Sequence, residues 1–270
     1  MAEMISSAAN PLVKRLRSLA DRKYRRRESA FVVQGIQPVW QAIESDAEVE
    51  VIVVAPGLLR HPGALGMIAE QEAAGVRIAR LSNELFGRIS DRDTPSGLAA
   101  IVRATPVALD DVQVGPDSVF AALHEVGSPG NLGTIIRTAN AAGVSAVIMI
   151  GPSTDPYDPA AVKASMGALF AMPVAHAASA DEFIDWATDG GVTVAATSAR
   201  GTATCWTAEL PLPFAFLLGS EGAGLPAELL DRCDVHVRIP MVGTAESLNL
   251  AAAAAILLFE LPRRRASGQI

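Results

Sequence analysis

The sequence predicts an α/β protein of two domains, the second built on a mainly parallel sheet. Short β-rich runs alternate with helical patterns from residue 31 to residue 102, and the same alternation resumes at residue 119. Residues 105–118 lie between them, contain two prolines and three acidic residues, and show no strong periodicity, as is typical of a linker. The predicted domains are therefore 1–104 and 119–270. Half of the 270 residues are hydrophobic, enough for a sizeable core.

The elements follow from local patterns, with β-branched and apolar runs indicating strands and amphipathic stretches indicating helices. In the first domain the predicted strands are 31–35, 49–55, 76–80 and 98–103, and the predicted helices are 38–45, 64–75 and 83–90. In the second domain the predicted strands are 119–124, 146–150, 192–197, 214–218 and 235–240. The predicted helices there are 134–143, 161–170, 181–190, 226–233 and 247–260. The last helix contains an unbroken run of alanines at 251–255, so neighbouring backbone must approach it closely.

Charge is distributed unevenly along the chain. The net charge is −7, but residues 14–27 carry eight Lys or Arg residues against one Asp, a local +7 that leaves −14 for the rest. A solvated helix face is the ordinary explanation of a basic run. Because neighbouring like charges repel, the concentration of cations also fits a surface that binds the phosphates of a nucleic acid.

Other features favour a cytoplasmic protein without a membrane partner. The N-terminus lacks the apolar core of a secretory signal, and Cys205 and Cys233 have neither metal-site nor disulfide-framework spacing. The apolar stretch 247–259 is too short to span a bilayer and is bracketed by Glu246 and Glu260, so we expect a buried helix.

Three glycines directly follow a predicted strand in LLGSEGAGLP, residues 217–226. Gly219, Gly222 and Gly224 either permit a tight strand-to-helix turn or leave the main chain bare for a ligand. Both interpretations stay open from the residues alone. Strand ends followed by glycine-rich turns are where open α/β sheets bind ligands.

Two further loops lie after predicted strands. In the first, Asn131 precedes a helix whose free N–H groups attract anions, and Arg137 follows among apolar residues. An arginine on an amphipathic helix is ordinarily solvated, so Arg137 alone does not indicate a site. In the second, Ser247 is placed to cap the last helix, and Asn249 requires a polar partner wherever it is buried.

Common enzyme motifs do not match. A dinucleotide site reads G-x-G-x-x-G in the first strand-to-helix turn, whereas 219–224 reads G-x-x-G-x-G near the end of the chain, which disfavours a nicotinamide dehydrogenase. Phosphate-loop, zinc-protease and serine-hydrolase motifs are missing from the sequence. We expect no metal, because no metal spacing relates the histidines His61, His124, His176 and His236.

Four motifs taken in order resemble those of the SpoU (TrmH) branch of the SPOUT class of RNA methyltransferases. They are SPGNLGTIIRTANAAG, KASMGALFAMPV, LLGSEGAGLP and IPMVGTAESLNLAAAAAILLFE, and the likeness covers 119–261 almost continuously. The N-terminal stretch ISSAANPLVKRLRSLADRKYRRRESAFVVQG resembles the substrate-binding extension of the same enzymes, a small domain similar to ribosomal protein L30e.

The resemblance implies an α/β fold with a trefoil-knotted C-terminal SPOUT domain, one of the rare exceptions to unknotted topology, beside a smaller L30e-like RNA-binding domain. It implies a homodimer, joined through the C-terminal domain, that transfers a methyl group from S-adenosyl-L-methionine to a ribose 2′-hydroxyl, with structured RNA as the partner and 23S ribosomal RNA favoured. A slim helix threaded through a loop would account for the alanines.

Residue roles follow from the same resemblance. The implied catalytic residues are Asn131, Arg137, Glu221, Ser247 and Asn249. The implied cofactor-binding residues are Thr197, Ser198, Gly219, Ser220, Glu221, Ile239, Met241 and Leu248. The basic segment would contact RNA phosphates through Arg22, Lys23, Arg25, Arg26 and Arg27. One departure from the family pattern is Ser128, where an aspartate often precedes the proline.

The implied reaction is an in-line displacement, in which the site orients the hydroxyl and stabilises its developing oxyanion. Because a guanidinium is effectively always protonated, we expect Arg137 to hold the target phosphate and the oxyanion, and Glu221 to hold Arg137 or other donors. The alternatives are a transfer-RNA methyltransferase, a catalytically inactive RNA-binding adaptor, or a small-molecule α/β enzyme. The arginines at 263–265 are expected to be solvated.

Overall fold

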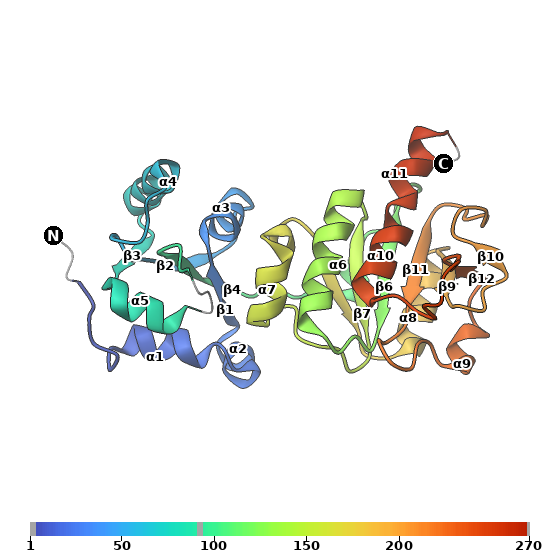
Figure 1. The fold of residues 1–270 in the computed structure, drawn as a ribbon, viewed down its shortest axis with the longest axis horizontal. Helices are drawn as coiled ribbons and strands as arrows, with labels where there is room; N and C mark the ends of the chain where they lie inside the picture. The colour runs from blue at the N-terminus through green and yellow to red at the C-terminus, as the bar shows by residue number, and fades with distance from the viewer. Residues whose placement is uncertain (1–3, 91–93, 269–270) are drawn as a thin grey trace. The chain divides into compact units, whose positions relative to one another are not determined.

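The computed structural model describes residues 4–90 and 94–268, which form two compact units (Figure 1). The smaller unit comprises the chain up to Thr105 together with Tyr157–Phe170. The larger unit comprises Pro106–Pro156 and the chain from Ala171 onward. Residues 157–170, expected in the second domain, belong to the smaller unit because Val162 and Phe170 pack into its apolar core.

The smaller unit is built on a four-stranded mixed sheet in the order β1-β4-β2-β3. Strand β4 pairs antiparallel with both β1 and β2, whereas β2 and β3 are parallel. The strands lie close to their predicted ranges, at β1 (Ala30–Gln34), β2 (Val49–Val54), β3 (Arg77–Arg80) and β4 (Leu98–Arg103).

Helices pack against both faces of this sheet. Alternate strand residues point to opposite faces, so Val51 and Val53 pack with α1 and α5, whereas Ile52 and Val54 pack with α3, α4 and α7. The helices are α1 (Pro11–Ser18), α2 (Arg22–Glu28), α3 (Ile36–Glu44), α4 (Pro62–Ala73), α5 (Asn83–Ile89) and α7 (Pro159–Ser165), followed by the short η2 (Ala168–Phe170).

The larger unit contains an eight-stranded sheet in the order β10-β12-β9-β11-β6-β7-β8-β5. Every neighbouring pair is parallel, which confirms the predicted parallel sheet. Its strands are β5 (Val107–Ala108), β6 (Val119–His124), β7 (Ala146–Ile150), β8 (Val174–Ala177), β9 (Thr193–Thr197), β10 (Ala203–Thr204), β11 (Phe214–Leu218) and β12 (Val235–Arg238).

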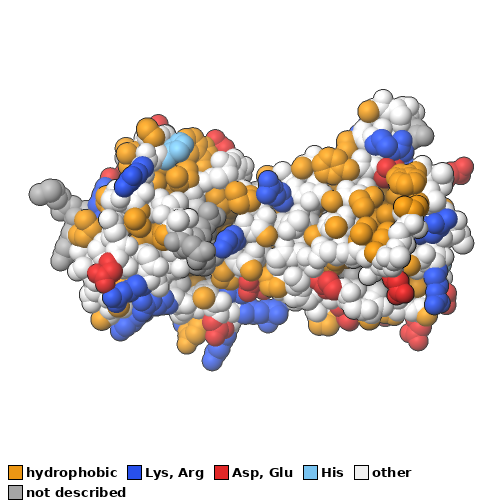
Figure 2. Space-filling model, in the orientation of Figure 1, with side chains coloured by type: hydrophobic (Ala, Val, Ile, Leu, Met, Phe, Trp, Pro, Cys, Tyr) orange, Lys and Arg blue, Asp and Glu red, His pale blue; other side chains and the backbone are white. Residues whose placement is uncertain are grey.

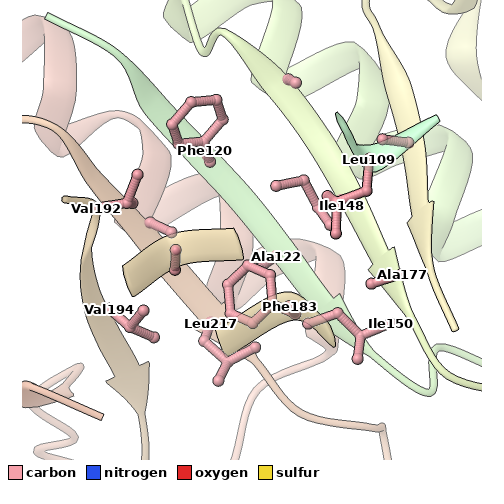
Figure 3. Close-up of a cluster of buried hydrophobic side chains, with 14 of the residues drawn as sticks. Leu109, Phe120, Ala122, Ile148, Ile150, Ala177, Phe183, Val192, Val194 and Leu217 are labelled. Carbon is pink, nitrogen blue, oxygen red and sulfur yellow. The ribbon is translucent and has the colours of Figure 1, made fainter. Parts of the chain in front are cut away.

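Helices cover both faces of the larger sheet as well. On one face Phe183 of α8 packs among Phe120, Ile148 and Leu217 of the strands (Figure 3). The opposite face is covered by α6 and α10, which lie side by side in front of the sheet in Figure 1. The helices are α6 (Pro129–Ala142), α8 (Ala180–Asp189), α9 (Ala227–Leu230), α10 (Leu250–Leu258) and α11 (Glu260–Ala266), with a short η1 (Leu109–Asp111).

Two of the predicted boundaries that differ from the structure have a local explanation. The expected linker 105–118 contributes β5 and η1 to the larger unit, and Leu109 is buried in its core. A two-residue strand is too short to produce a detectable alternation. The expected helix 161–170 ends at Ser165, because Met166 and Gly167 have φ of 51° and 96°, outside the helical region. Within the described residues, no helix is long and apolar enough to cross a bilayer.

Candidate functional site

A cavity of about 380 Å³ lies in the larger unit at the carboxyl ends of β9, β11 and β12. Its volume falls within the roughly 300–1,000 Å³ of small-molecule sites. The structure brings every sequence-predicted cofactor residue to its wall, namely Thr197, Ser198, Gly219, Ser220, Glu221, Ile239, Met241 and Leu248. The carboxyl edge of a parallel sheet is the expected place for a ligand.

The loop after β11 folds back on itself through its glycines. The backbone N–H groups of Ser220 and Gly224 donate to each other's carbonyl oxygens at 3.2 and 3.1 Å. A Cβ added at Gly219 would lie 2.2 Å from the carbonyl carbon of Gly224, and Gly224 has φ +70°. Both glycines are therefore required by the turn. The same loop also lines the cavity, so the turn does not exclude the ligand interpretation of LLGSEGAGLP.

The alanines of α10 let this helix pass between the cavity and α6. Ala251 and Ala254 are buried, whereas Ala253 and Leu257 line the cavity on the other side. Small side chains on both sides are needed because α10 packs along α6 and against β11.

Sequence reasoning missed several cavity-lining residues. Val237 precedes Ile239 by two residues on the same strand face, and Leu250, Ala253 and Leu257 recur at helical spacing. Extending the strand and helix periodicities from Ile239 and Leu250 would have identified them.

Glu221 joins the loop after β11 to the loop after β6. Its Oε1 accepts the N–H of Ser128 at 3.3 Å and the side-chain amide of Asn131 at 3.0 Å, and its Oε2 accepts the N–H of Gly127 at 3.3 Å. Partial burial raises the pKa of Glu221, but these hydrogen bonds together outweigh it and lower the pKa below its usual value. The carboxylate is therefore ionised at neutral pH and locks the two loops together.

Asn249, rather than Ser247, caps the last helix. The side-chain Oδ1 of Asn249 accepts from the backbone N–H groups of Ala251 and Ala252 at 2.9 and 3.3 Å, so α10 begins at Leu250. Its Nδ2 donates to Oδ1 of Asn131 at 3.1 Å. The polar partner required for Asn249 is thus Asn131, and Ser247 instead lines the cavity. The expected cap at Ser247 is corrected.

The loop after β6 departs from the family pattern at Ser128, and the structure explains why serine is tolerated there. Ser128 is the N-cap of α6, where its Oγ accepts the N–H of Asn131 at 3.3 Å. Serine and aspartate cap helices about equally well. A serine at this position therefore retains the local geometry that presents Asn131 to Glu221.

Arg137 lies apart from this hydrogen-bond network. It is on the exposed face of α6, outside the cavity wall, and its guanidinium makes no hydrogen bond or ion pair with the described residues. The structure thus brings together Asn131, Glu221 and Asn249, with Ser247 at the cavity, and leaves the guanidinium of Arg137 in solvent.

The basic helix α2 of the smaller unit divides into exposed and buried cations. Arg22, Lys23, Arg26 and Arg27 are exposed. Arg25 is only 4% exposed. Its guanidinium donates to the carbonyl oxygens of Leu19 and Ala20 at 3.0 and 2.6 Å and lies 3.4 Å from the carboxylate of Asp158. The expected phosphate contact by Arg25 is therefore corrected, because this side chain holds the α1–α2 turn and the start of α7.

A similar correction applies to α11. Arg264, expected to be solvated, is 5% exposed and donates to the carbonyl oxygens of Cys205 and Ala208 at 3.0 and 2.9 Å. Its Nε lies 3.7 Å from the buried carboxylate of Glu260. Arg264 therefore fixes α11 to the segment between β10 and β11.

Comparison with known proteins relates both parts of the chain to one class of enzyme. A family model described as the SpoU rRNA Methylase family matches residues 118–259, and one described as an MRM3-like substrate binding domain matches residues 10–100. The chain is 31% identical over 259 residues, covering 96% of this chain and 99% of the relative, to the 23S rRNA (guanosine(2553)-2′-O)-methyltransferase RlmP of Bacillus subtilis.

Two further relatives give the same picture. The 23S rRNA (uridine(2479)-2′-O)-methyltransferase of Streptomyces viridochromogenes is 31% identical, covering 93% of this chain and 88% of the relative. The crystal structure of an AdoMet-bound rRNA methyltransferase from Sinorhizobium meliloti superposes with a TM-score of 0.88 at 35% identity, covering 97% of this chain and 98% of that one. Its four ordered motifs, its fold and these matches show that the chain belongs to the SpoU rRNA methylase family.

Proposed function

We propose that this chain transfers a methyl group from S-adenosyl-L-methionine to a ribose 2′-hydroxyl of 23S ribosomal RNA. As a member of the SpoU rRNA methylase family, the chain is an RNA methyltransferase. The observation that carries the proposal is the cavity at the carboxyl edge of the sheet, joined through Glu221 to the Asn131–Asn249 pair. Relatives aligned over nearly the whole chain carry names specifying 2′-O-methylation of 23S rRNA.

The cavity fits the proposed cofactor in both size and chemistry. Gly219 and Ser220 present backbone polar groups, while Ile239, Met241 and Leu248 present apolar surface for an adenosine. Thr197 and Ser198 add hydroxyls at the end of β9. Bound there, the cofactor supplies a methyl group already activated by its sulfonium. This reaction calls for no metal, because the leaving group carries the positive charge.

The neighbouring network would orient the RNA ribose. Asn131 and Asn249 are held in fixed positions by Glu221 and by the first turn of α10, so their amides can align a hydroxyl without reorganisation. Ser247 would contribute from the cavity wall. Arg137 would contact the target phosphate and stabilise the developing oxyanion, which its exposed position on α6 permits.

The smaller unit would hold the RNA backbone. The exposed cations of α2, namely Arg22, Lys23, Arg26 and Arg27, form the phosphate-binding surface that we propose. Figure 2 shows Lys and Arg side chains gathered at the lower edge of this unit, over α1 and α2. Ribosomal RNA as substrate places the proposed activity in the cytoplasm.

The proposed functional form is a homodimer joined through the larger unit, with the chain threaded as a trefoil knot around the cofactor cavity. Large apolar side chains exposed along the end of α10 support the interface, because Ile256 is 38% and Phe259 is 51% exposed. Light scattering should give twice the monomer mass, and Phe259→Glu should shift that mass toward the monomer. A wild-type monomer at micromolar concentration would contradict this assembly.

The function is tested by mapping ribose methylation in 23S rRNA from cells with and without this chain. One 2′-O-methyl group should disappear with the chain and be restored in vitro by purified protein with S-adenosyl-L-methionine. Arg137→Ala should lower turnover by about 100-fold or more and leave cofactor affinity unchanged. Arg232→Ala, which alters an exposed arginine that pairs with Asp181, should retain turnover. Methylation of transfer RNA alone, or of no RNA, would overturn the proposal.

A further inference from the structure

A second cavity, of about 200 Å³, lies in the smaller unit beside the basic helix. It opens at the edge strand β1, between the end of α1, the end of α5 and the helix α7. Its walls are mainly apolar and include Leu16, Ala20, Val32, Ile89 and Val162. This cavity belongs to neither the cofactor site nor the ribose-orienting network, both of which are in the larger unit.

The side chain of Gln34 adds a polar amide to these apolar walls. Val32 and Gln34 are two residues apart on β1, so both side chains leave the same face of the strand and reach the cavity. The amide of Gln34 is 3.1 Å from the hydroxyl of Ser90 and 3.4 Å from the carbonyl oxygen of Ile89, which fixes its orientation. An amide offers both donor and acceptor groups, as the edge of a nucleobase does.

Among the described residues that line the cavity, every charged side chain is a cation. Arg17, Arg88 and Lys163 line it, and all three residues are exposed. Arg88 is also held by Glu84 at 2.6 Å. Helix α2, with its exposed cations, begins two residues after Ala20, so the basic surface and the cavity are continuous. An apolar ligand alone would gain nothing from this surrounding charge.

We propose that this cavity receives the base of one unpaired nucleotide of the RNA substrate. The base packs against Leu16, Val32 and Val162, and the flanking phosphates lie at Arg17 and Lys163. Unpaired bases splayed out of the strand are the usual targets of sequence-specific RNA recognition. The cavity is smaller than the roughly 300–1,000 Å³ of complete small-molecule sites, so it suits one part of a ligand whose remainder lies outside. This inference rests on the proposed RNA methyltransferase function.

Filling the cavity without changing its charge tests the proposal. Ala20→Leu should weaken binding of an unmodified 23S rRNA transcript by about tenfold, the range expected for loss of one packed base. It should raise KM for that transcript and leave both kcat and S-adenosyl-L-methionine affinity unchanged. Ala73→Leu, at the exposed end of α4 outside the cavity, is the matched control and should bind the transcript like wild type.

A charge variant provides an independent measurement. Arg17→Gln should reduce the slope of log affinity against log salt by about one, whereas Arg77→Gln, on β3 at the opposite edge of the sheet, should not. If the wild-type protein binds and methylates the transcript and Ala20→Leu binds it equally well, the base pocket is overturned and the proposed function stands. A wild-type protein that neither binds nor methylates the transcript would overturn the proposed function and this inference with it.

Discussion

The proposed cofactor cavity and the basic surface around α2 are built by different means. The cavity depends on backbone geometry, since the loop at 219–224 closes on itself through glycines and the neighbouring loops are joined by Glu221. The basic surface depends on several exposed cations on one short helix. A single atom added to the first region should therefore abolish its function, whereas the second should lose affinity in small steps.

Each of the two units also has a buried arginine, and its sequence neighbours do not share its role. Arg25 in α2 and Arg264 in α11 each donate to two carbonyl oxygens of a preceding segment and lie near one carboxylate. The arginines beside them are mostly exposed. A run of like charges in a sequence therefore mixes buried side chains that hold the fold with exposed side chains that a ligand can reach.

The largest expected effect is the loss of S-adenosyl-L-methionine binding in Gly219→Ala. The added Cβ would lie 2.2 Å from backbone atoms of Gly224, which no side-chain rotation can relieve. Calorimetry should find no measurable S-adenosyl-L-methionine binding, while RNA affinity at low salt stays near that of wild type. Gly243→Ala is the control, since its Cβ would meet nothing within 4 Å. Normal cofactor affinity in Gly219→Ala would contradict the backbone-built cavity.

The next largest expected effect is a loss of stability in Arg264→Ala. The substitution removes the buried donor to the carbonyl oxygens of Cys205 and Ala208, whereas Glu260 keeps Arg263 at 2.7 Å. Because two buried carbonyl groups lose their charged donor, the free energy of unfolding of the larger unit should fall by about 2 kcal/mol. Urea unfolding followed by tryptophan fluorescence measures the change. Arg265→Ala, at a neighbouring exposed position, should change it by less than about 0.5 kcal/mol. Equal losses in the two variants would contradict the anchoring role.

These two predictions also mark the limit of sequence reasoning. The apolar run 214–218 and the alternating run 235–240 predicted strands of the parallel sheet, because each signal is local. The glycines after β11 left a tight turn and a ligand loop both open. The anchoring of Arg264 by Cys205 and Ala208 joins residues more than fifty positions apart. No periodicity within α11 distinguishes Arg264 from Arg265.

The cap of α10 shows the same limit at the site itself. Ser247 and Asn249 are both good capping residues, and the sequence favoured the first. The structure selects Asn249 because its amide also reaches Asn131, whose position depends on Glu221 in a third loop. The resemblance named candidate residues for the site, but only the tertiary contacts show which of them are hydrogen-bonded to one another.

A smaller effect with a distinct pH dependence is expected from Glu221→Gln. The folded protein lowers the pKa of Glu221 below 4.5, so the carboxylate contributes stability above its unfolded pKa and loses that contribution as pH falls through the folded pKa. At pH 7 the variant should be less stable by under about 1 kcal/mol, because the group is largely exposed. The thermal midpoints of wild type and variant should converge as the pH is lowered from 7 to below 4.5. A constant difference over that range would contradict the ionised link between the loops.

The smallest effects are expected on α2, where Arg25 and Arg26 should separate stability from RNA affinity. Arg26→Gln should lower transcript affinity only a few-fold and reduce the salt slope by about one, because one exposed phosphate contact is lost. Arg25→Gln should leave the salt slope unchanged and lower the unfolding midpoint of the smaller unit, because its guanidinium is bound to Leu19, Ala20 and Asp158. Filter binding at several salt concentrations and thermal unfolding measure the two quantities in the same preparations. If both variants changed the salt slope equally, Arg25 would have to leave its carbonyl partners to meet RNA, and burial would no longer separate the structural arginine from the binding ones.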